Sequence, residues 1–259
     1  MILCSFGGLY LSGKNLIHWK NDADETTKQI EIIEEKVEIK EIEVSDSQEI
    51  IEQDFPVSAP DPYWDYIKMN LIEVNFAELK TINEDTKGWI QVNGTNVNYP
   101  FVQSSDNDFY LTHTFDKSWN DAGWVFLDYR NRIENMHQNT IFYAHARWDK
   151  SMFGSLKDIF KNGWLNNSDN FVIKLSTEKE NTLWQVFSAY RIPTTNDYLQ
   201  IDFTNQDDFI KFGTMLIKRS QYDFQTGIQK NDKIITLSTC YNDEEKVVIH
   251  AKLIKRELR

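Results

Sequence analysis

The stretch KIITLSTCYNDEEKVVIHAKLI, residues 233–254, decides the fold. It contains two β-rich runs, one from Lys233 to Cys240 and one from Lys246 onward, separated by the polar loop YNDEE. Both runs are rich in Val, Ile or Thr, which favour strands. Because the first run ends on Cys240, we expect this side chain at a strand end, facing a loop.

Six further runs of the same kind precede this stretch, each bounded by turn residues. They begin at Trp89, Val97, Trp124, Asn139, Phe171 and Leu183. Many short strands separated by turn residues predict a mainly β domain, either a barrel or a sandwich. Two helix-like stretches precede them at residues 63–72 and 76–82, and two more helices are expected at residues 152–160 and 206–219. The last of these carries apolar residues at helical spacing.

The charged residues are unevenly distributed along the chain. The 259 residues carry 28 Lys+Arg and 40 Asp+Glu, a formal net charge of −12, which argues against a general nucleic-acid binder. Residues 21–54 alone hold 13 acidic residues and 3 lysines, with no aromatic residue. This composition predicts an acidic, solvated spacer at residues 21–60, closed by a proline cluster, and a folded domain at residues 61–259. The apolar spacing inside the spacer fits a helix at some positions and a strand at others.

The first twelve residues, MILCSFGGLYLS, are apolar and uncharged. At about 1.5 Å per residue they reach about 18 Å as a helix, short of a hydrocarbon core of about 30 Å. Residues 1–20 are therefore either the outer end of a membrane anchor or an apolar N-terminus. We favour the anchor.

Two cysteines, Cys4 and Cys240, are too few for a structural zinc site of closely spaced ligands, and no metal or other cofactor is expected. Cys240 is either a buried thiol or a nucleophile. His145 ends another β-rich run, NTIFYAHA, and is either a surface residue or a base. A thiol and an imidazole on neighbouring strand ends would form the pair that acyl transfer needs.

From about Tyr63 to the C-terminus the chain resembles the class B sortases, cysteine transpeptidases of Gram-positive cell surfaces. The matching stretches are NYPFVQSSDNDFYL, GWVFLDYRNR, NTIFYAHARWDKSMFGSL, VFSAYRIPTTNDYLQIDF, KIITLSTC and VVIHAK. The resemblance implies an eight-stranded sortase-like β-barrel with N-terminal helices and a further helix inserted before the strand that bears the cysteine.

The resemblance also implies roles for individual residues. His145 matches the catalytic histidine, and Cys240 matches the nucleophile that attacks the threonyl carbonyl of an Asn-Pro-x-Thr type sorting signal. Lys246 matches the catalytic arginine. The positions that match the signal-binding groove are Leu111, Thr194, Tyr198, Leu199 and Ser238.

Two positions depart from the family pattern. Ala144 replaces the glycine of the usual Tyr-Gly-His block, which is a mild change. Lys246 replaces an arginine, and a lysine is a flexible point charge where arginine offers a planar fork. Three outcomes follow for the role of the family arginine. Lys246 fills this role alone, or Arg147 or Arg191 takes it over, or the enzyme has low activity. Alternatively, Lys246 is only a solvated lysine at a strand edge.

The expected function is cleavage of a sorting signal, formation of a thioester on Cys240 and transfer to a peptidoglycan amine. A sortase-like binding module and a thiol hydrolase that uses water are the alternatives. The expected partners are surface proteins that carry the signal, the peptidoglycan precursor amine and the membrane. The expected location is the cell membrane, with a single-pass N-terminal anchor and an extracellular catalytic domain.

Overall fold

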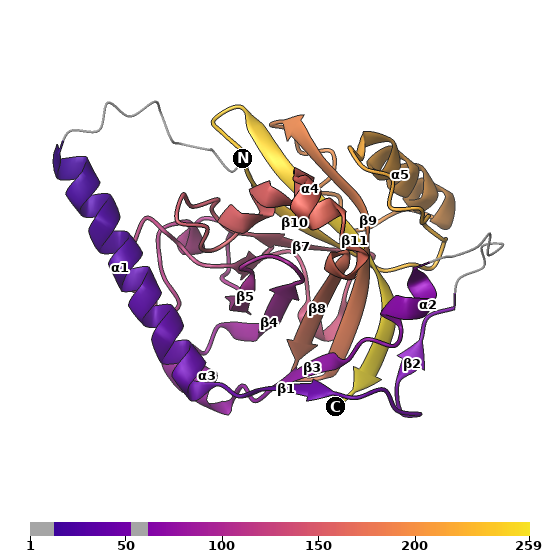
Figure 1. The fold of residues 1–259 in the computed structure, drawn as a ribbon, viewed down its shortest axis with the longest axis horizontal. Helices are drawn as coiled ribbons and strands as arrows, with labels where there is room; N and C mark the ends of the chain where they lie inside the picture. Colours follow the sequence, from indigo (N-terminus) through magenta and orange to yellow (C-terminus); the bar gives the residue numbers. More distant parts are fainter. Residues whose placement is uncertain (1–12, 53–61) are drawn as a thin grey trace.

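The computed structural model describes residues 13–52 and 62–259 (Figure 1). Its centre is a closed β-barrel of eight strands. These strands are β4 (Thr86–Val92), β5 (Asn98–Val102), β6 (Phe126–Leu127), β7 (Asn139–Tyr143), β8 (Val172–Thr177), β9 (Glu180–Pro193), β10 (Ile234–Cys240) and β11 (Glu245–Leu258). Each of the eight runs expected from the sequence overlaps one of them, so the prediction of a mainly β, eight-stranded barrel is confirmed.

Strand order brings distant parts of the sequence together. The sheet runs β10-β7-β6-β5-β4-β8-β9-β11, and an additional β10–β11 pairing closes it into a barrel. The β10–β7 pairing is parallel, with Ser238 opposite Tyr143, whereas β10 and β11 are antiparallel, with Cys240 opposite Lys246. These registers place the ends of β7 and β10 and the start of β11 at one end of the barrel.

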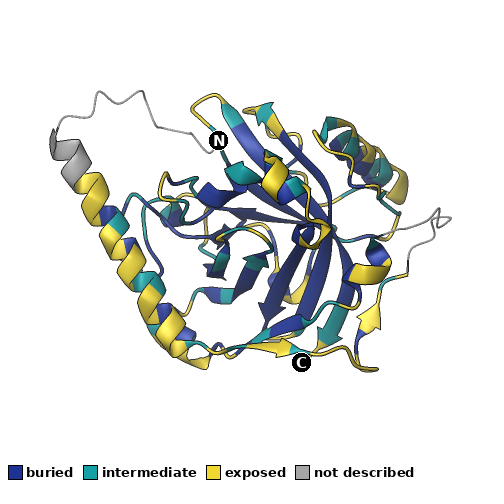
Figure 2. Ribbon diagram, viewed as in Figure 1, coloured by how far each residue is buried: buried dark blue, intermediate teal, exposed yellow. Residues whose placement is uncertain are grey.

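Large apolar side chains fill the barrel, and Figure 2 shows its strands as the most buried part of the ribbon. Trp89, Trp124 and Trp184 are almost fully buried. A second apolar cluster lies under α5 (Gln206–Arg219), where Phe209, Phe212 and Leu216 pack with residues of β9, β10 and β11. This helix, expected from its apolar spacing, is the insertion before the cysteine strand.

The other helices of the barrel domain are short. They are α2 (Tyr63–Tyr66), α3 (Ala77–Ile82), α4 (Asn162–Leu165) and the 3₁₀ segments η1 (Phe109–Leu111), η2 (Ile133–Asn135), η3 (Gly154–Phe160) and η4 (Ser168–Asn170). The helix expected at residues 76–82 is present as α3. The helix expected at residues 63–72 ends early because Leu71–Val74 forms strand β3, which pairs with β1 (Ile39–Ile42). The helix expected at residues 152–160 is the 3₁₀ segment η3.

The acidic segment has regular structure. It contains α1 (Gly13–Lys36), β1 and β2 (Glu49–Ile50), and β2 pairs with β11 at the edge of the barrel sheet. Helix α1 lies along one side of the molecule and is mostly exposed (Figure 2). Its residues Asp22, Thr26 and Ile33 are buried. Sequence periodicity leaves helix and strand open here, and the structure contains both.

Within residues 13–52 and 62–259, no helix is both long enough and apolar enough to cross a membrane. This finding contradicts the expected location in the cell membrane through a single-pass N-terminal anchor. Helix α1 is long but carries many charged residues. The apolar residues 1–12 lie outside the described part of the chain.

Candidate active site

Three side chains expected to be catalytic come from three neighbouring strands at the same end of the barrel. In the parallel β7–β10 pair, Tyr143 lies opposite Ser238. His145 and Cys240 each follow two residues later, so both sit at the carboxyl ends of adjacent parallel strands. The β10 strand is tied to the residue before His145, because the Thr239 hydroxyl donates to the Ala144 carbonyl at 2.7 Å.

Lys246 faces the cysteine from the other side. It lies opposite Cys240 in the β10–β11 register, and its Nζ donates to the Cys240 Sγ at 3.4 Å. The residue is only 6% exposed, so it is not a solvated strand-edge lysine. Burial lowers the pKa of its ammonium, because desolvation disfavours the charged form. An ammonium at this distance would stabilise a thiolate.

Cys240 itself is half-buried at the strand end. The nucleophile of acyl transfer is the thiolate, and a cysteine at a partly exposed strand end can be reached by a substrate.

The His145 ring has one proton position fixed by its surroundings. Its Nε2 lies 2.8 Å from the Leu111 carbonyl oxygen, which can only accept, so Nε2 carries hydrogen. The neutral ring then has Nδ1 as its proton-accepting atom. Burial lowers the pKa of His145, and the nearby charges of Arg147 and Lys246 act in the same direction. The ring is therefore neutral at physiological pH and can accept a proton.

The loop after His145 is folded back on itself. Phe153 donates its backbone N–H to the His145 carbonyl at 3.0 Å. A side chain at Gly154 would meet the Arg147 carbonyl oxygen at 2.2 Å, so only glycine permits this close approach. The loop thus holds the backbone of His145 in place.

The two alternative arginines lie in different surroundings. Arg147 is buried, with its Nε 3.7 Å from the Asp149 carboxylate and its guanidinium 5.6 Å from the centre of the Trp19 ring. Arg191 is exposed and stacks on the Tyr241 ring at 4.5 Å. Of the three cations, Lys246 is the one that donates to the cysteine sulfur.

The residues expected to line the signal-binding groove fall into two groups. Tyr198 and Ser238 are buried and hydrogen-bonded to each other at 3.0 Å, and Leu199 is half-buried beside them. Thr194 is exposed and bonded through its backbone N–H to the Glu244 carbonyl in the loop after Cys240. Leu111 contacts His145 through its carbonyl, a role the sequence did not indicate.

Three polar residues that the sequence did not single out are bonded around Tyr198 and Leu199. Asp128 and Arg130 belong to the run LDYRNR, and Asn139 begins β7. All three have hydrogen-bond partners near Tyr198 and Leu199. The Asp-x-Arg spacing in that run was the available signal, but nothing in the sequence indicated the distant partners.

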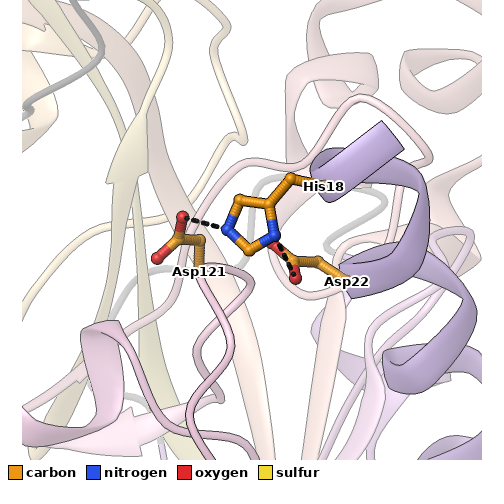
Figure 3. Close-up of side chains that lie close together, drawn as sticks. All are labelled: His18, Asp22 and Asp121. Carbon is orange, nitrogen blue, oxygen red and sulfur yellow. Dashed lines mark ion pairs between the residues drawn. The ribbon is translucent and has the colours of Figure 1, made fainter. Parts of the chain in front are cut away.

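Among the described residues, one group could supply metal ligands: His18 and Asp22 of α1 with Asp121 of a loop. Figure 3 shows the His18 ring between the two carboxylates, with each ring nitrogen 3.5 Å from a different one. A single metal ion would bind one ring nitrogen and both carboxylates at about 2 Å. The arrangement instead resembles an imidazole that bridges two carboxylates and links α1 to the loop.

Comparison with known proteins identifies the architecture. A family model described as a sortase domain matches residues 90–254. The sortase B of Staphylococcus aureus is 34% identical over 188 residues, covering 71% of this chain and 76% of that protein. The sortase B of Listeria monocytogenes is 32% identical over 183 residues, covering 69% and 74%.

A solved structure gives the same result. The Staphylococcus aureus sortase B–substrate complex is 34% identical, with a TM-score of 0.65, over 70% of this chain and 84% of that one. A further structure, of a Bacillus anthracis protein described as similar to sortase B, is 30% identical with a TM-score of 0.66, over 96% of this chain and 100% of that one. The chain therefore belongs to the sortase family as a class B member, and it is a cysteine transpeptidase.

Proposed function

We propose that this sortase cleaves an Asn-Pro-x-Thr type sorting signal and joins the carried protein to a peptidoglycan amine. The observation that carries the proposal is the placement of His145 and Cys240 on adjacent parallel strand ends, with the Lys246 ammonium 3.4 Å from the sulfur. The substrate complex of the Staphylococcus aureus relative supports a peptide substrate. A solved sortase B complex with triglycine supports an amine acceptor.

The proposed reaction has two halves. The Cys240 thiolate attacks the threonyl carbonyl carbon, and a C–S bond forms as the C–N bond to the next residue breaks. His145, neutral at the start, takes the proton of the Cys240 thiol as the thiolate forms and then gives this proton to the leaving amine, so that a thioester remains on Cys240. In the second half the acceptor amine attacks this thioester, His145 takes the proton of that amine, and the thiolate leaves.

In this proposal Lys246 first stabilises the thiolate and then the oxyanion that forms beside the sulfur. Its compact ammonium provides charge but no two-point fork. Leu111 holds the His145 ring through its carbonyl, and Tyr198, Leu199, Ser238 and Thr194 form the groove that receives the signal. Surface proteins that carry the signal are the proposed partners.

The test is cleavage of a fluorescent Asn-Pro-x-Thr peptide by reduced protein, with and without triglycine as acceptor, followed by intact mass. We expect a thioester adduct on Cys240 and a new peptide–glycine product when triglycine is present. Cys240→Ala should abolish cleavage without loss of the thermal transition. Product formed by water alone would identify a hydrolase, and peptide binding without an adduct would identify a binding module.

A further inference from the structure

The backbone between Tyr198 and Ile201 is held by hydrogen bonds from two residues, Asn139 and Arg130. The Asn139 side-chain amide donates to the carbonyls of Tyr198 at 3.3 Å and Gln200 at 2.8 Å, and its backbone N–H reaches the Ile201 carbonyl at 3.4 Å. The carbonyl between them, that of Leu199, accepts instead from Arg130 Nη2 at 3.2 Å. Arg130 and Asn139 therefore hold different carbonyls of the same short segment, and Arg130 holds that of Leu199.

Arg130 can hold that carbonyl because its own position is fixed. Its Nε and Nη2 donate to both oxygens of Asp128 at 2.9 and 2.8 Å, in the bidentate geometry that is strongest for this pair. Asp128 is fully buried, and burial alone would raise its pKa. The hydrogen bonds from Arg130 outweigh burial, so that the pKa of Asp128 lies below its usual value.

The same carboxylate is bonded to the strand that carries the catalytic histidine. The Tyr143 hydroxyl donates to Asp128 Oδ2 at 2.9 Å, two residues before His145. Asp128 is therefore a common anchor for β7 and, through Arg130, for Leu199.

We propose that Arg130 is a positioning residue of this sortase: anchored on Asp128, it holds the Leu199 carbonyl and so sets the affinity for the peptide signal. The proposal rests on the proposed function, in which Leu199 contacts the signal. The side-chain hydrogen bonds of Arg130 go to Asp128 and Leu199 rather than to the three catalytic side chains. Its loss should thus weaken peptide binding and leave the chemical step unchanged.

The test compares wild type, Arg130→Lys and Arg130→Met. Lysine keeps the charge but has one nitrogen, which cannot bond both Asp128 oxygens and the Leu199 carbonyl together. We expect both variants to raise KM for the Asn-Pro-x-Thr peptide about 3- to 10-fold, as loss of one net hydrogen bond implies, with kcat within about twofold. Arg256→Lys is the control, because Arg256 pairs with Glu49 at the β2 edge through its Nε.

Amide hydrogen exchange provides a second readout that needs no substrate. We expect faster exchange at residues 196–201 in both Arg130 variants and wild-type exchange in the control. A KM equal to wild type in Arg130→Met, with active wild-type protein, would overturn the proposal. If wild type does not cleave the peptide, the proposed function fails. The exchange data then test the positioning role of Arg130 by themselves. Unchanged amide exchange at residues 196–201 in the Arg130 variants overturns this role, and faster exchange supports it.

Discussion

At the scale of single residues, Lys246 occupies the position at which the family resemblance implies a catalytic arginine. Its ammonium lies 3.4 Å from the cysteine sulfur and is buried, so its charge acts in a medium that screens it weakly. We expect Lys246→Met to lower kcat/KM for the signal peptide by about 10²-fold, toward the lower end for loss of one charge-stabilising donor. Alkylation of Cys240 by iodoacetamide at pH 7 should slow as well, because the thiolate loses its cation.

The matching control is Lys252→Met. Lys252 is buried on the same strand but donates to the Gly227 carbonyl at 2.9 Å, so its loss should change stability and leave the rate of the folded enzyme unchanged. Lys246→Arg should keep most of the activity if the space beside Cys240 accepts a planar fork. Equal peptide cleavage by wild type and Lys246→Met would remove Lys246 from the mechanism.

A second residue, His250, connects pH to stability. It is fully buried on β11, and burial, with a smaller effect of Arg219, lowers its pKa to about 3. The Thr236 hydroxyl donates to Asn139 and therefore accepts from His250 Nδ1, which leaves Nε2 to accept from the Tyr190 hydroxyl. Protonation of Nε2 would destroy that acceptor, so the folded state holds the neutral ring.

The direction in which pH changes the free energy of unfolding follows from proton uptake by His250. The unfolded histidine binds a proton near pH 6.5 and the folded one only near pH 3, so between these values the unfolded state holds more protons. His250 should therefore lower the free energy of unfolding by roughly 1.4 kcal/mol per pH unit as pH falls through this window. Urea denaturation of wild type and His250→Gln at pH 7, 5.5 and 4.5 measures the difference. A slope equal in both proteins would contradict this role.

At the scale of elements, strands were predictable and their partners were not. Runs such as KIITLSTC and KVVIHAKLI are rich in residues that favour strands, and each became a barrel strand. The sequence could also place His145 and Cys240 at strand ends. It could not show that Arg130 reaches Leu199, or that Leu111 bonds to His145, because those contacts join segments 69 and 34 residues apart. The family resemblance supplied the barrel, which the strand pattern alone left undecided from a sandwich.

Helix α2 and strand β3 show a related limit. The sequence predicts a helix at residues 63–72, but the helix ends at Tyr66, and the carbonyls that follow are held by a buried lysine from β11. Lys255 Nζ donates to the carbonyls of Ile67 at 3.0 Å and Met69 at 2.5 Å. No local pattern indicates a partner so far along the chain.

Lys255 is thus expected to stabilise the connection between α2 and β3. Lys255→Met leaves two carbonyls without their donor, and we expect a loss of about 1–3 kcal/mol in the free energy of unfolding. Lys68→Met is the control, since Lys68 is exposed and pairs only with Asp65, and it should change stability by less than about 0.5 kcal/mol. Chemical denaturation of the three proteins is the measurement. Equal midpoints and slopes for Lys255→Met and wild type would exclude the bond network as a source of stability.

At the scale of the whole molecule, the N-terminal segment is attached to the barrel domain without forming its centre. Strand β2 adds only two residues to the sheet, and α1 contacts the loop before β6 through polar groups. The Asn120 amide donates to the Asp22 carbonyl at 3.1 Å, and the Gln29 amide donates to the Ser118 hydroxyl at 3.4 Å. The apolar contribution is smaller, with Ile33 the buried member from α1. The eight strands of the barrel all lie downstream.

Deletion of residues 1–54 should therefore leave a folded, active enzyme of reduced stability. It removes β1 from β3, β2 from β11 and Ile33 from the core, so we expect the melting temperature to fall by several degrees, as about 1–2 kcal/mol implies for a domain this size. Since His145, Cys240, Lys246 and the Tyr198–Leu199 loop are held by barrel strands, kcat for the peptide should stay within about twofold of the full chain. Calorimetry and peptide cleavage, on the truncated and full-length proteins side by side, measure both quantities. If the truncated protein shows no cooperative transition, α1, β1 and β2 are required for folding, and the domain begins before the proline cluster rather than after it.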